Sequence, residues 1–224
     1  MLQKRATDLP EQMDDPNCDP LWLRNTYAQF ALINRMVSGW ERVFRRYLAP
    51  GLEPGCTILD VGCGGGDLSR NLARWAIAAR QPVRVTGIDP DPRALEFARS
   101  RRQVEGVEYL QATAEELLSR GRHFDYVVSN HLLHHLPEEC LSGFLDTTAL
   151  LSRRIAVHND LRRHPAAWLA FGLTRPLFRN SFIVEDGLRS IRRSFTSAEL
   201  RAVAPAGWRV ERLSPFRNLA LFEA

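Results

Sequence analysis

Four stretches of this sequence combine residue types at spacings that could perform chemistry. The first is the glycine-rich run DVGCGGG at residues 60–66, which follows a hydrophobic stretch and precedes a helical one. Glycine lets the backbone turn sharply and approach a ligand closely, and a helix that begins there presents unpaired N–H groups. The run therefore predicts a ligand-binding loop between a strand and a helix.

Two common nucleotide-binding patterns do not fit this loop. Counted from Gly62, the third glycine of Gly-x-Gly-x-x-Gly falls on Asp67, so the dinucleotide fingerprint is incomplete. No Gly-Lys-Ser/Thr follows, which excludes a phosphate loop. Asp60 would repel a pyrophosphate, but its carboxylate could hold an ammonium group. The loop thus favours a ligand that carries an amine.

Acidic residues follow the next two hydrophobic stretches. Asp89 lies 23 residues after Gly66, where a carboxylate at a strand end can accept hydrogen bonds from two ribose hydroxyls. The run QATAE at residues 111–115 forms an acid-containing turn that suits an adenine amine. Glu115 could instead be a helix N-terminal acid that the helix dipole favours.

Histidines follow the fourth and fifth hydrophobic stretches. The run SNHLLHHL occupies residues 129–136, and His158 comes directly after the fifth stretch. Strand ends border the ligand cleft in open α/β sheets, and a neutral histidine can take a proton from a phenol or an ammonium group. On a helix His131 and His135 would share one face, while His134 points elsewhere. Each of these histidines could equally form hydrogen bonds within the core.

Patterns for metal binding and for hydrolysis are incomplete. His131 and His135 have the spacing of a metal-binding pair, but the glutamate of His-Glu-x-x-His is missing, so we expect no metal site. The chain contains no Gly-x-Ser-x-Gly, which argues against a serine hydrolase.

Alternating strand and helix patterns position these groups. Strands with helical crossovers indicate a parallel sheet that is covered on both faces. Two later strands must be antiparallel to each other because only a short loop joins them. The predicted strands are 57–61, 83–88, 107–111, 124–129, 154–158, 208–213 and 218–222, and the predicted helices are 67–79, 92–101, 114–119, a helical stretch that continues to 151, and 196–203.

Two segments lie outside this alternation. Residues 1–20 are polar and broken by prolines, which predicts a loosely held arm, and amphipathic helical patterns follow up to residue 48. We expect residues 1–50 to form this arm and a helical lid, residues 51–224 to form the ligand-binding domain, and residues 161–195 to be an inserted substrate lid. The alternative for the insertion is a solvated helix pair with a core face. The aromatic residues expected to shape an apolar substrate pocket are Tyr27, Trp168, Phe171, Phe178 and Phe182.

The composition is that of an ordinary globular protein. Of 224 residues, 45% are hydrophobic and 25% charged, which excludes wholesale disorder. The net charge of +4 permits a polyanionic partner without requiring one, and nine arginines face only three acids between residues 152 and 195. No apolar run reaches the length of a membrane span or a secretory signal. The four cysteines form no Cys-x-x-Cys, so we expect free thiols and a cytoplasmic location.

In order and spacing, the four motifs resemble those of the class I S-adenosylmethionine (SAM)-dependent methyltransferases. Within that class the chain is most similar to the small-molecule group that includes ubiquinone- and menaquinone-type enzymes, over residues 57–157. The resemblance implies an α/β, Rossmann-like, doubly wound, mostly parallel seven-stranded sheet with an antiparallel last strand. It also implies SAM as the cofactor and S-adenosylhomocysteine (SAH) as the product.

The resemblance carries roles to matching residues. Gly62 and Gly64 would pack under the methionine part, Asp89 would bind the ribose, and Ala114 with Glu115 would flank the adenine. The full set of expected cofactor-binding residues is Asp60, Gly62, Cys63, Gly64, Gly66, Asp89, Pro90, Ala114, Glu115, Ser129 and Asn130.

The resemblance further implies methyl transfer to an apolar, aromatic or polyketide-like small molecule, with O-methylation ahead of C- or N-methylation. The arm around residues 13–16 and the insertion together resemble those of methyltransferases found near type III polyketide synthases. In related enzymes that methylate amines, the histidine before the last leucine of the matching segment assists deprotonation, which corresponds to His135; His131 and His158 are the other candidate bases.

Two alternative functions are weaker. An RNA methyltransferase would suit the basic pI, but the fourth strand lacks Asn/Asp-Pro-Pro-Tyr/Phe, and we expect no nucleic-acid partner. A non-catalytic SAM-binding accessory subunit should have lost Asp60 or Asp89, and both are present.

Overall fold

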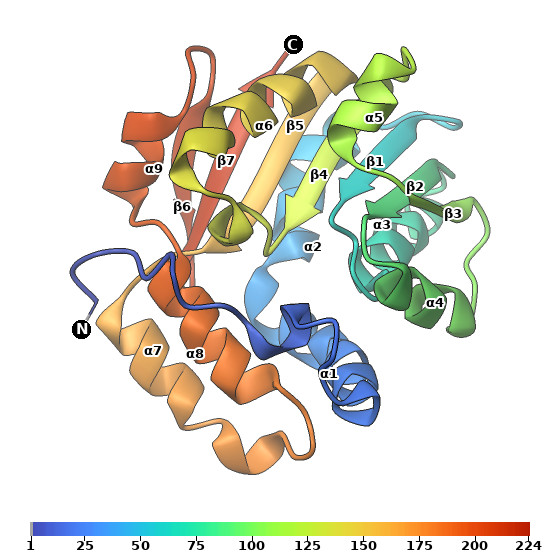
Figure 1. The fold of residues 1–224 in the computed structure, drawn as a ribbon. Helices are drawn as coiled ribbons and strands as arrows, with labels where there is room; N and C mark the ends of the chain where they lie inside the picture. The colour runs from blue at the N-terminus through green and yellow to red at the C-terminus, as the bar shows by residue number, and fades with distance from the viewer. Residues whose placement is uncertain (1) are drawn as a thin grey trace.

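Seven strands form one sheet in the order β3-β2-β1-β4-β5-β7-β6. The computed structural model describes residues 2–224 (Figure 1). Strands β1 to β5 pair in parallel, whereas β7 is antiparallel to both β5 and β6. This arrangement confirms the predicted fold class. The strands are β1 Thr57–Val61, β2 Arg84–Asp89, β3 Val107–Gln111, β4 Phe124–Asn130, β5 Ser152–Leu161, β6 Arg209–Leu213 and β7 Arg217–Glu223.

Helices cover both faces of the sheet. One face packs against α3 through residues such as Leu72, and the other packs against α5, α6 and α9 through Leu117, Leu145 and Leu200. None of the helices in the described part of the chain has the length and apolar character needed to cross a membrane. The α-helices are α1 Pro20–Ile33, α2 Trp40–Val43, α3 Asp67–Ala78, α4 Pro92–Ser100, α5 Ala114–Ser119, α6 Glu138–Leu151, α7 Pro165–Gly172, α8 Ile183–Arg193 and α9 Ser197–Val203.

Short helical turns of other types connect these elements. Two π-helical segments follow α1 and α2, and single 3-10 turns lie in the arm, after the second π segment, after β4 and after α7. They are η1 Gln12–Asp14, η2 Asn34–Ser38, η3 Phe44–Leu48, η4 Ala49–Gly51, η5 Leu133–His135 and η6 Arg175–Leu177.

A helical layer lies at the end of the sheet to which the parallel strands point. Figure 1 shows α1, α7 and α8 side by side below the arrowhead of β4. Ile33 of α1 and Leu188 of α8 belong to one buried cluster, against which Trp168 and Phe171 of α7 pack. The layer is thus held together by its own small apolar core.

The arm (residues 2–19) crosses this layer and is held by hydrogen bonds, which differs from the loosely held arm that we predicted. The Asp186 carboxylate of α8 accepts hydrogen bonds from the backbone N–H groups of Gln12 and Met13, at 2.7 and 3.0 Å. Arginines of the insertion donate to carbonyl oxygens of the arm: Arg163 to Leu2 at 3.0 Å and Arg189 to Pro10 at 2.6 Å. Sequence periodicity could not show this, because all these contacts join residues more than 150 positions apart.

Candidate active site

A cavity of about 400 Å³ lies where the carboxyl ends of β1, β2 and β4 meet α1 and the arm. In open α/β sheets this is the edge at which ligands bind. The loop after β1, the turns after β2 and β4, α1 and the arm all contribute to its lining, which includes Gly62, Cys63, Gly64, Asp89, Tyr27 and Met13.

The glycine-rich loop needs glycine at positions 64 and 66. Both have left-handed backbone angles, with φ of 49° and 70°. A Cβ atom on Gly66 would lie 2.4 Å from the Tyr109 hydroxyl, so this residue keeps the start of α3 close to the sheet. A Cβ on Gly64 would meet nothing within 4 Å, because this part of the loop faces the cavity. A ligand can therefore approach the backbone closely there.

Three carboxylates line the cavity around this loop. Asp60 is buried at the end of β1, where it accepts a hydrogen bond from the Ser69 hydroxyl at 2.6 Å. Burial raises the pKa of Asp60 to about 7, and the nearby carboxylates of Asp67 and Asp89 add to this rise. Burial also raises the pKa of Asp67 and of Asp89. This concentration of acids suits a ligand with positive charge.

Asp89 is oriented by backbone N–H groups. Its Oδ2 accepts from Gly64 at 2.9 Å and its Oδ1 accepts from Asp91 at 2.9 Å. Each oxygen keeps a second lone pair, so the carboxylate can still accept from two hydroxyl groups on a ligand. These features fit the amine, the cationic sulfur and the ribose of SAM.

The expected cofactor-binding residues divide into two groups. Asp60, Gly62, Cys63, Gly64, Asp89, Pro90 and Asn130 line the cavity, whereas Gly66, Ala114, Glu115 and Ser129 do not. Ala114 packs into the sheet core, and Glu115 is exposed in the first turn of α5, as its alternative interpretation predicted.

His158 does not face the cavity, contrary to our expectation. It is fully buried, with its ring stacked on Trp208 at a centroid distance of 5.3 Å. Its Nδ1 lies 2.7 Å from the Ser129 hydroxyl and its Nε2 lies 2.9 Å from the Thr148 hydroxyl. The Thr148 hydroxyl donates to Leu145, so it accepts from Nε2–H. Burial lowers the pKa of His158 to about 3, and the residue is a neutral part of the core.

His131 lines the cavity, but its ring is already engaged. Residues 131–135 form a turn and the 3-10 segment η5 rather than one continuous helix, so His131 and His135 do not share a helix face. Arg217 Nη1 lies 3.1 Å from His131 Nε2. Burial, with the Arg217 charge, lowers the pKa of His131 far below its usual value. This arrangement keeps His131 neutral and makes it a poor proton acceptor.

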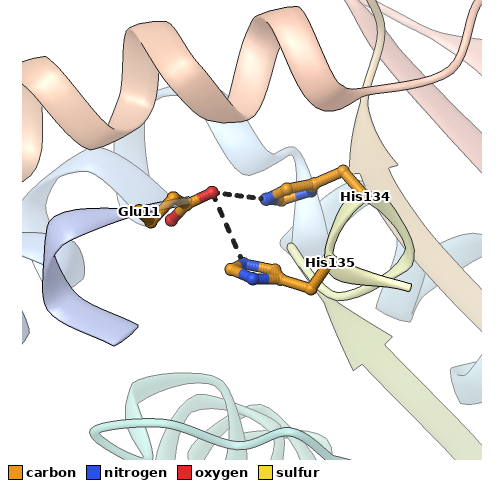
Figure 2. Close-up of side chains that lie close together, drawn as sticks. All are labelled: Glu11, His134 and His135. Atoms are coloured by element: carbon orange, nitrogen blue, oxygen red, sulfur yellow. Dashed lines mark ion pairs between the residues drawn. The ribbon is translucent and has the colours of Figure 1, made fainter. Parts of the chain in front are cut away.

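His134 and His135 meet Glu11 of the arm, as Figure 2 shows. Glu11 Oε1 lies 3.3 Å from Nε2 of His134 and 3.6 Å from Nε2 of His135, and it accepts a hydrogen bond from Ser190 at 2.7 Å. His134 also contacts Asp160 Oδ1 through Nδ1 at 2.7 Å. Glu11 is only 4% exposed, whereas the side chain of His135 is 28% exposed at the cavity wall.

Charges set the ionisation of this cluster. Burial opposes the charge on His134, but Asp160 and Glu11 outweigh it and raise the pKa of His134 to about 9. Burial likewise opposes the charge on Glu11, but the two histidines and Ser190 lower the pKa of Glu11 to about 2. Without another cation, the cluster therefore holds a proton on His134 between two carboxylates.

Four of the five expected pocket aromatics lie elsewhere. Tyr27 lines the cavity. Trp168, Phe171 and Phe178 pack between α1, α7 and α8, and Phe182 packs against Leu23 and Tyr27. These side chains form the core of the helical layer, because the insertion must bury its own apolar face before it can cover a ligand.

Sequence reasoning missed several residues that line the cavity. Asp67 opens α3 directly after the glycine loop, so its position could have been found. Asn34 donates to Asp67 at 2.9 Å, and Glu11 and Asp14 reach the cavity from the arm. No local pattern marks these three residues, because tertiary contacts alone bring them to the sheet edge.

Comparison with known proteins gives a family match and several structural neighbours. Residues 58–153 match the family model described as "Methyltransferase domain". A ubiquinone biosynthesis O-methyltransferase from Methylobacterium sp. (strain 4-46) is 36% identical over 107 residues, which are 46% of this chain and 40% of that protein. The enzyme of the same name from Aeromonas salmonicida (strain A449) is 34% identical over 152 residues, 65% of this chain and 59% of that protein. The chain thus matches less than two thirds of the length of these relatives.

Two solved structures share the fold over most of the chain. Magnesium protoporphyrin IX methyltransferase from Synechocystis PCC 6803 with bound SAM superposes with a TM-score of 0.55 and 17% identity, covering 94% of this chain and 86% of that chain. The plantazolicin methyltransferase BpumL with a triazolic substrate analogue and SAH gives a TM-score of 0.61 and 15% identity, covering 95% and 93%.

Proposed function

We propose that the chain is a class I SAM-dependent methyltransferase and that it transfers a methyl group from SAM to a small molecule. The observation that carries this proposal is the cavity between the glycine-rich loop and Asp89, whose acidic lining suits a cationic cofactor. When bound, SAM supplies an electrophilic methyl group on a sulfonium.

The proposed cofactor site uses residues at three strand ends. Asp60 holds the amino group, the backbone at Gly62 and Gly64 packs under the methionine part, and Asp89 accepts from the ribose hydroxyls. We also propose that Ala114 and Glu115 flank the adenine. Because the reaction is an in-line displacement, positioning two bound reactants supplies most of the rate enhancement.

The proposed acceptor is apolar and aromatic or polyketide-like, with an oxygen as the first candidate for the methylated atom. Tyr27 and Phe30 supply apolar wall on the α1 side of the cavity. The acceptor loses its proton at the cluster of Glu11, His134 and His135. Among the three candidate bases in the sequence, His135 is the one exposed to the cavity without an arginine on its ring.

The proposal also includes the organisation of the chain and its surroundings. Residues 51–224 form the methyltransferase domain, and residues 1–50 with the insertion 161–195 form the lid over the acceptor. We also propose a cytoplasmic location. We propose that the chain has no nucleic-acid partner, because arginines of the insertion bind the arm.

Calorimetric titration of SAH tests the cofactor site. We expect one SAH per chain, and we expect Asp89→Ala to weaken binding roughly 100-fold or more because two hydrogen bonds to a charged group are lost. Asp146→Ala, on the exposed face of α6, is the matched control and should bind like the parent protein. Absence of SAH binding by the folded parent protein would refute the proposed function.

A screen of phenolic acceptors, read out as SAH release, then tests the acceptor side. We expect His135→Ala to retain the SAH affinity of the parent protein and to lose turnover. Unchanged turnover in this variant would remove His135 from the reaction.

A further inference from the structure

Three side chains that can ligate a metal ion converge at the cavity wall. Glu11, His134 and His135 each offer one ligand atom, and these atoms lie within 4.8 Å of one another (Figure 2). Glu11 precedes His134 by 123 positions in the sequence, so the fold assembles this set from the arm and the turn after β4. A set of two imidazole nitrogens and one carboxylate oxygen favours divalent transition metals over Mg²⁺ and Ca²⁺.

The separations within the set resemble the edges of a metal site. Glu11 Oε1 lies 3.3 and 3.6 Å from the two Nε2 atoms. A charge-assisted hydrogen bond would be shorter, at about 2.7–2.9 Å. Ligands bound to a tetrahedral zinc ion at about 2.0–2.1 Å are held roughly 3.3 Å apart. The observed distances therefore correspond to a shared cation better than to direct hydrogen bonds.

An outer carboxylate holds the His134 ring in the orientation that ligation needs, and a second carboxylate lies near the His135 ring. His134 Nδ1 contacts Asp160 at 2.7 Å, and His135 Nδ1 lies 3.3 Å from Asp14. Metal-binding histidines commonly donate their second N–H to a carboxylate, which fixes the tautomer and turns the other nitrogen toward the metal. With Nδ1 as the donor in each ring, lone pairs on both Nε2 atoms face the Glu11 carboxylate, and a bound cation would bridge them to it.

We propose that Glu11, His134 and His135 bind a divalent transition-metal ion, for which zinc is the best-fitting probe. All three residues line the cavity, so the remaining coordination positions face the acceptor space. A cation there lowers the pKa of an acceptor hydroxyl. This role rests on the proposed function, and in it His135 acts as a metal ligand in place of the base. Metal binding itself does not depend on the proposed function.

Titration of the metal-free full chain with Zn²⁺ and Co²⁺ tests the proposal. The parent protein and all variants in this titration carry Cys140→Ser, because the exposed Cys140 thiol could itself bind zinc. We expect one equivalent of Zn²⁺ to bind, Co²⁺ to give a visible ligand-field spectrum, and Mg²⁺ not to compete. Glu11→Gln and His135→Ala should each weaken Zn²⁺ binding at least tenfold, and Asp160→Asn should weaken it about 10- to 100-fold. The control His123→Ala, an exposed histidine outside the cavity, should bind as the parent does.

Circular dichroism and SAH titration of each variant separate loss of a ligand from loss of the fold. The proposal is overturned if the parent binds no stoichiometric Zn²⁺, or if Glu11→Gln and His135→Ala remain folded and bind Zn²⁺ like the parent. Either result would leave the cluster with its proton on His134. SAH binding by a chain that binds no zinc would refute only the metal site, whereas zinc binding without SAH binding would refute only the cofactor site.

Discussion

Histidines with the same chemistry have different environments around this cavity. His158 stacks on Trp208 in the core, Arg217 faces the ring of His131, and His134 lies between Asp160 and Glu11. The partners of the two ring nitrogens decide whether a histidine carries charge, stays neutral or meets a ligand.

Replacing His158 should cost stability without affecting the cofactor. We expect His158→Ala to lower the free energy of unfolding by roughly 2–4 kcal/mol, because it leaves a cavity and strands two buried hydroxyls. Urea denaturation measures this loss, and SAH calorimetry should give the parent affinity. His123→Ala at the surface is the control, with little change in either quantity. A fully stable His158→Ala variant would contradict the core role.

Asp60 should make cofactor binding depend on pH. Its pKa is raised from 3.8 to about 7 in the folded protein, so the carboxyl group stays protonated to higher pH than in the unfolded chain. The folded state therefore loses stability from this group as pH rises from about 4 to about 7. An ammonium group pairs with the ionised form, so SAH affinity should rise between pH 6 and pH 8. Calorimetry at several pH values measures it.

The matched variant for this effect is Asp60→Asn, which keeps the shape and removes the titration. We expect it to bind SAH more weakly at pH 8 and to show a flatter pH dependence. Equal SAH affinity of the parent protein at pH 6 and pH 8 would argue against an ionising Asp60 in the cofactor site.

At the scale of elements, close packing of α7 on α8 forms the helical layer. A Cβ atom on Gly187 of α8 would lie 2.1 Å from Cε1 of Phe171 on α7. The absence of a side chain at Gly187 therefore lets the Phe171 ring pack against the backbone of α8. Neither helix contributes a residue to the two apolar clusters that pack on the faces of the sheet, so this contact bears on the layer rather than on the fold as a whole.

Gly187→Ala should loosen α7 selectively. We expect a destabilisation of roughly 1–3 kcal/mol from overpacking, confined to the layer. Hydrogen exchange should become faster at α7 amides and stay unchanged in β1 and β4. Gly172→Ala is a matched control on α7, because its Cβ would lie 3.9 Å from the nearest atom, an ordinary contact. Equal exchange in both variants would count against the packing described.

At the scale of the whole molecule, the arm covers one side of the cavity at the strand ends, and the insertion holds the arm in place. Asp186, Arg163 and Arg189 of the insertion bind backbone groups of the arm. Some of the arginines that make the insertion basic therefore bind within the protein itself. Since Met13 and Asp14 line the cavity, the stability of the arm should govern ligand exchange.

Asp186→Ala should release the arm. It removes the acceptor for the N–H groups of Gln12 and Met13, so their amides should exchange faster while the sheet amides do not change. We also expect SAH to dissociate faster, as stopped-flow displacement would show. Asp146→Ala serves again as the surface control. An unchanged dissociation rate together with faster arm exchange would mean that the arm does not limit release.

The sequence by itself determined which segments form strands, the glycine-rich loop and the placement of Asp60 and Asp89 at strand ends. These features depend on local periodicity and on the rule that parallel strands direct their carboxyl ends to one edge. Backbone hydrogen bonding and burial of apolar faces impose them within a few residues, so a linear pattern is enough to reveal them.

Only the tertiary structure decided which histidine lines the cavity and which carboxylate contacts the histidines after β4. His158 lies within β5 and His135 follows β4, yet packing against Trp208 buries His158 while the turn after β4 exposes His135. Glu11 reaches His134 only because α8 binds the arm. Contacts between distant segments depend on how whole elements pack, and the spacing of residues along one element carries no information about them.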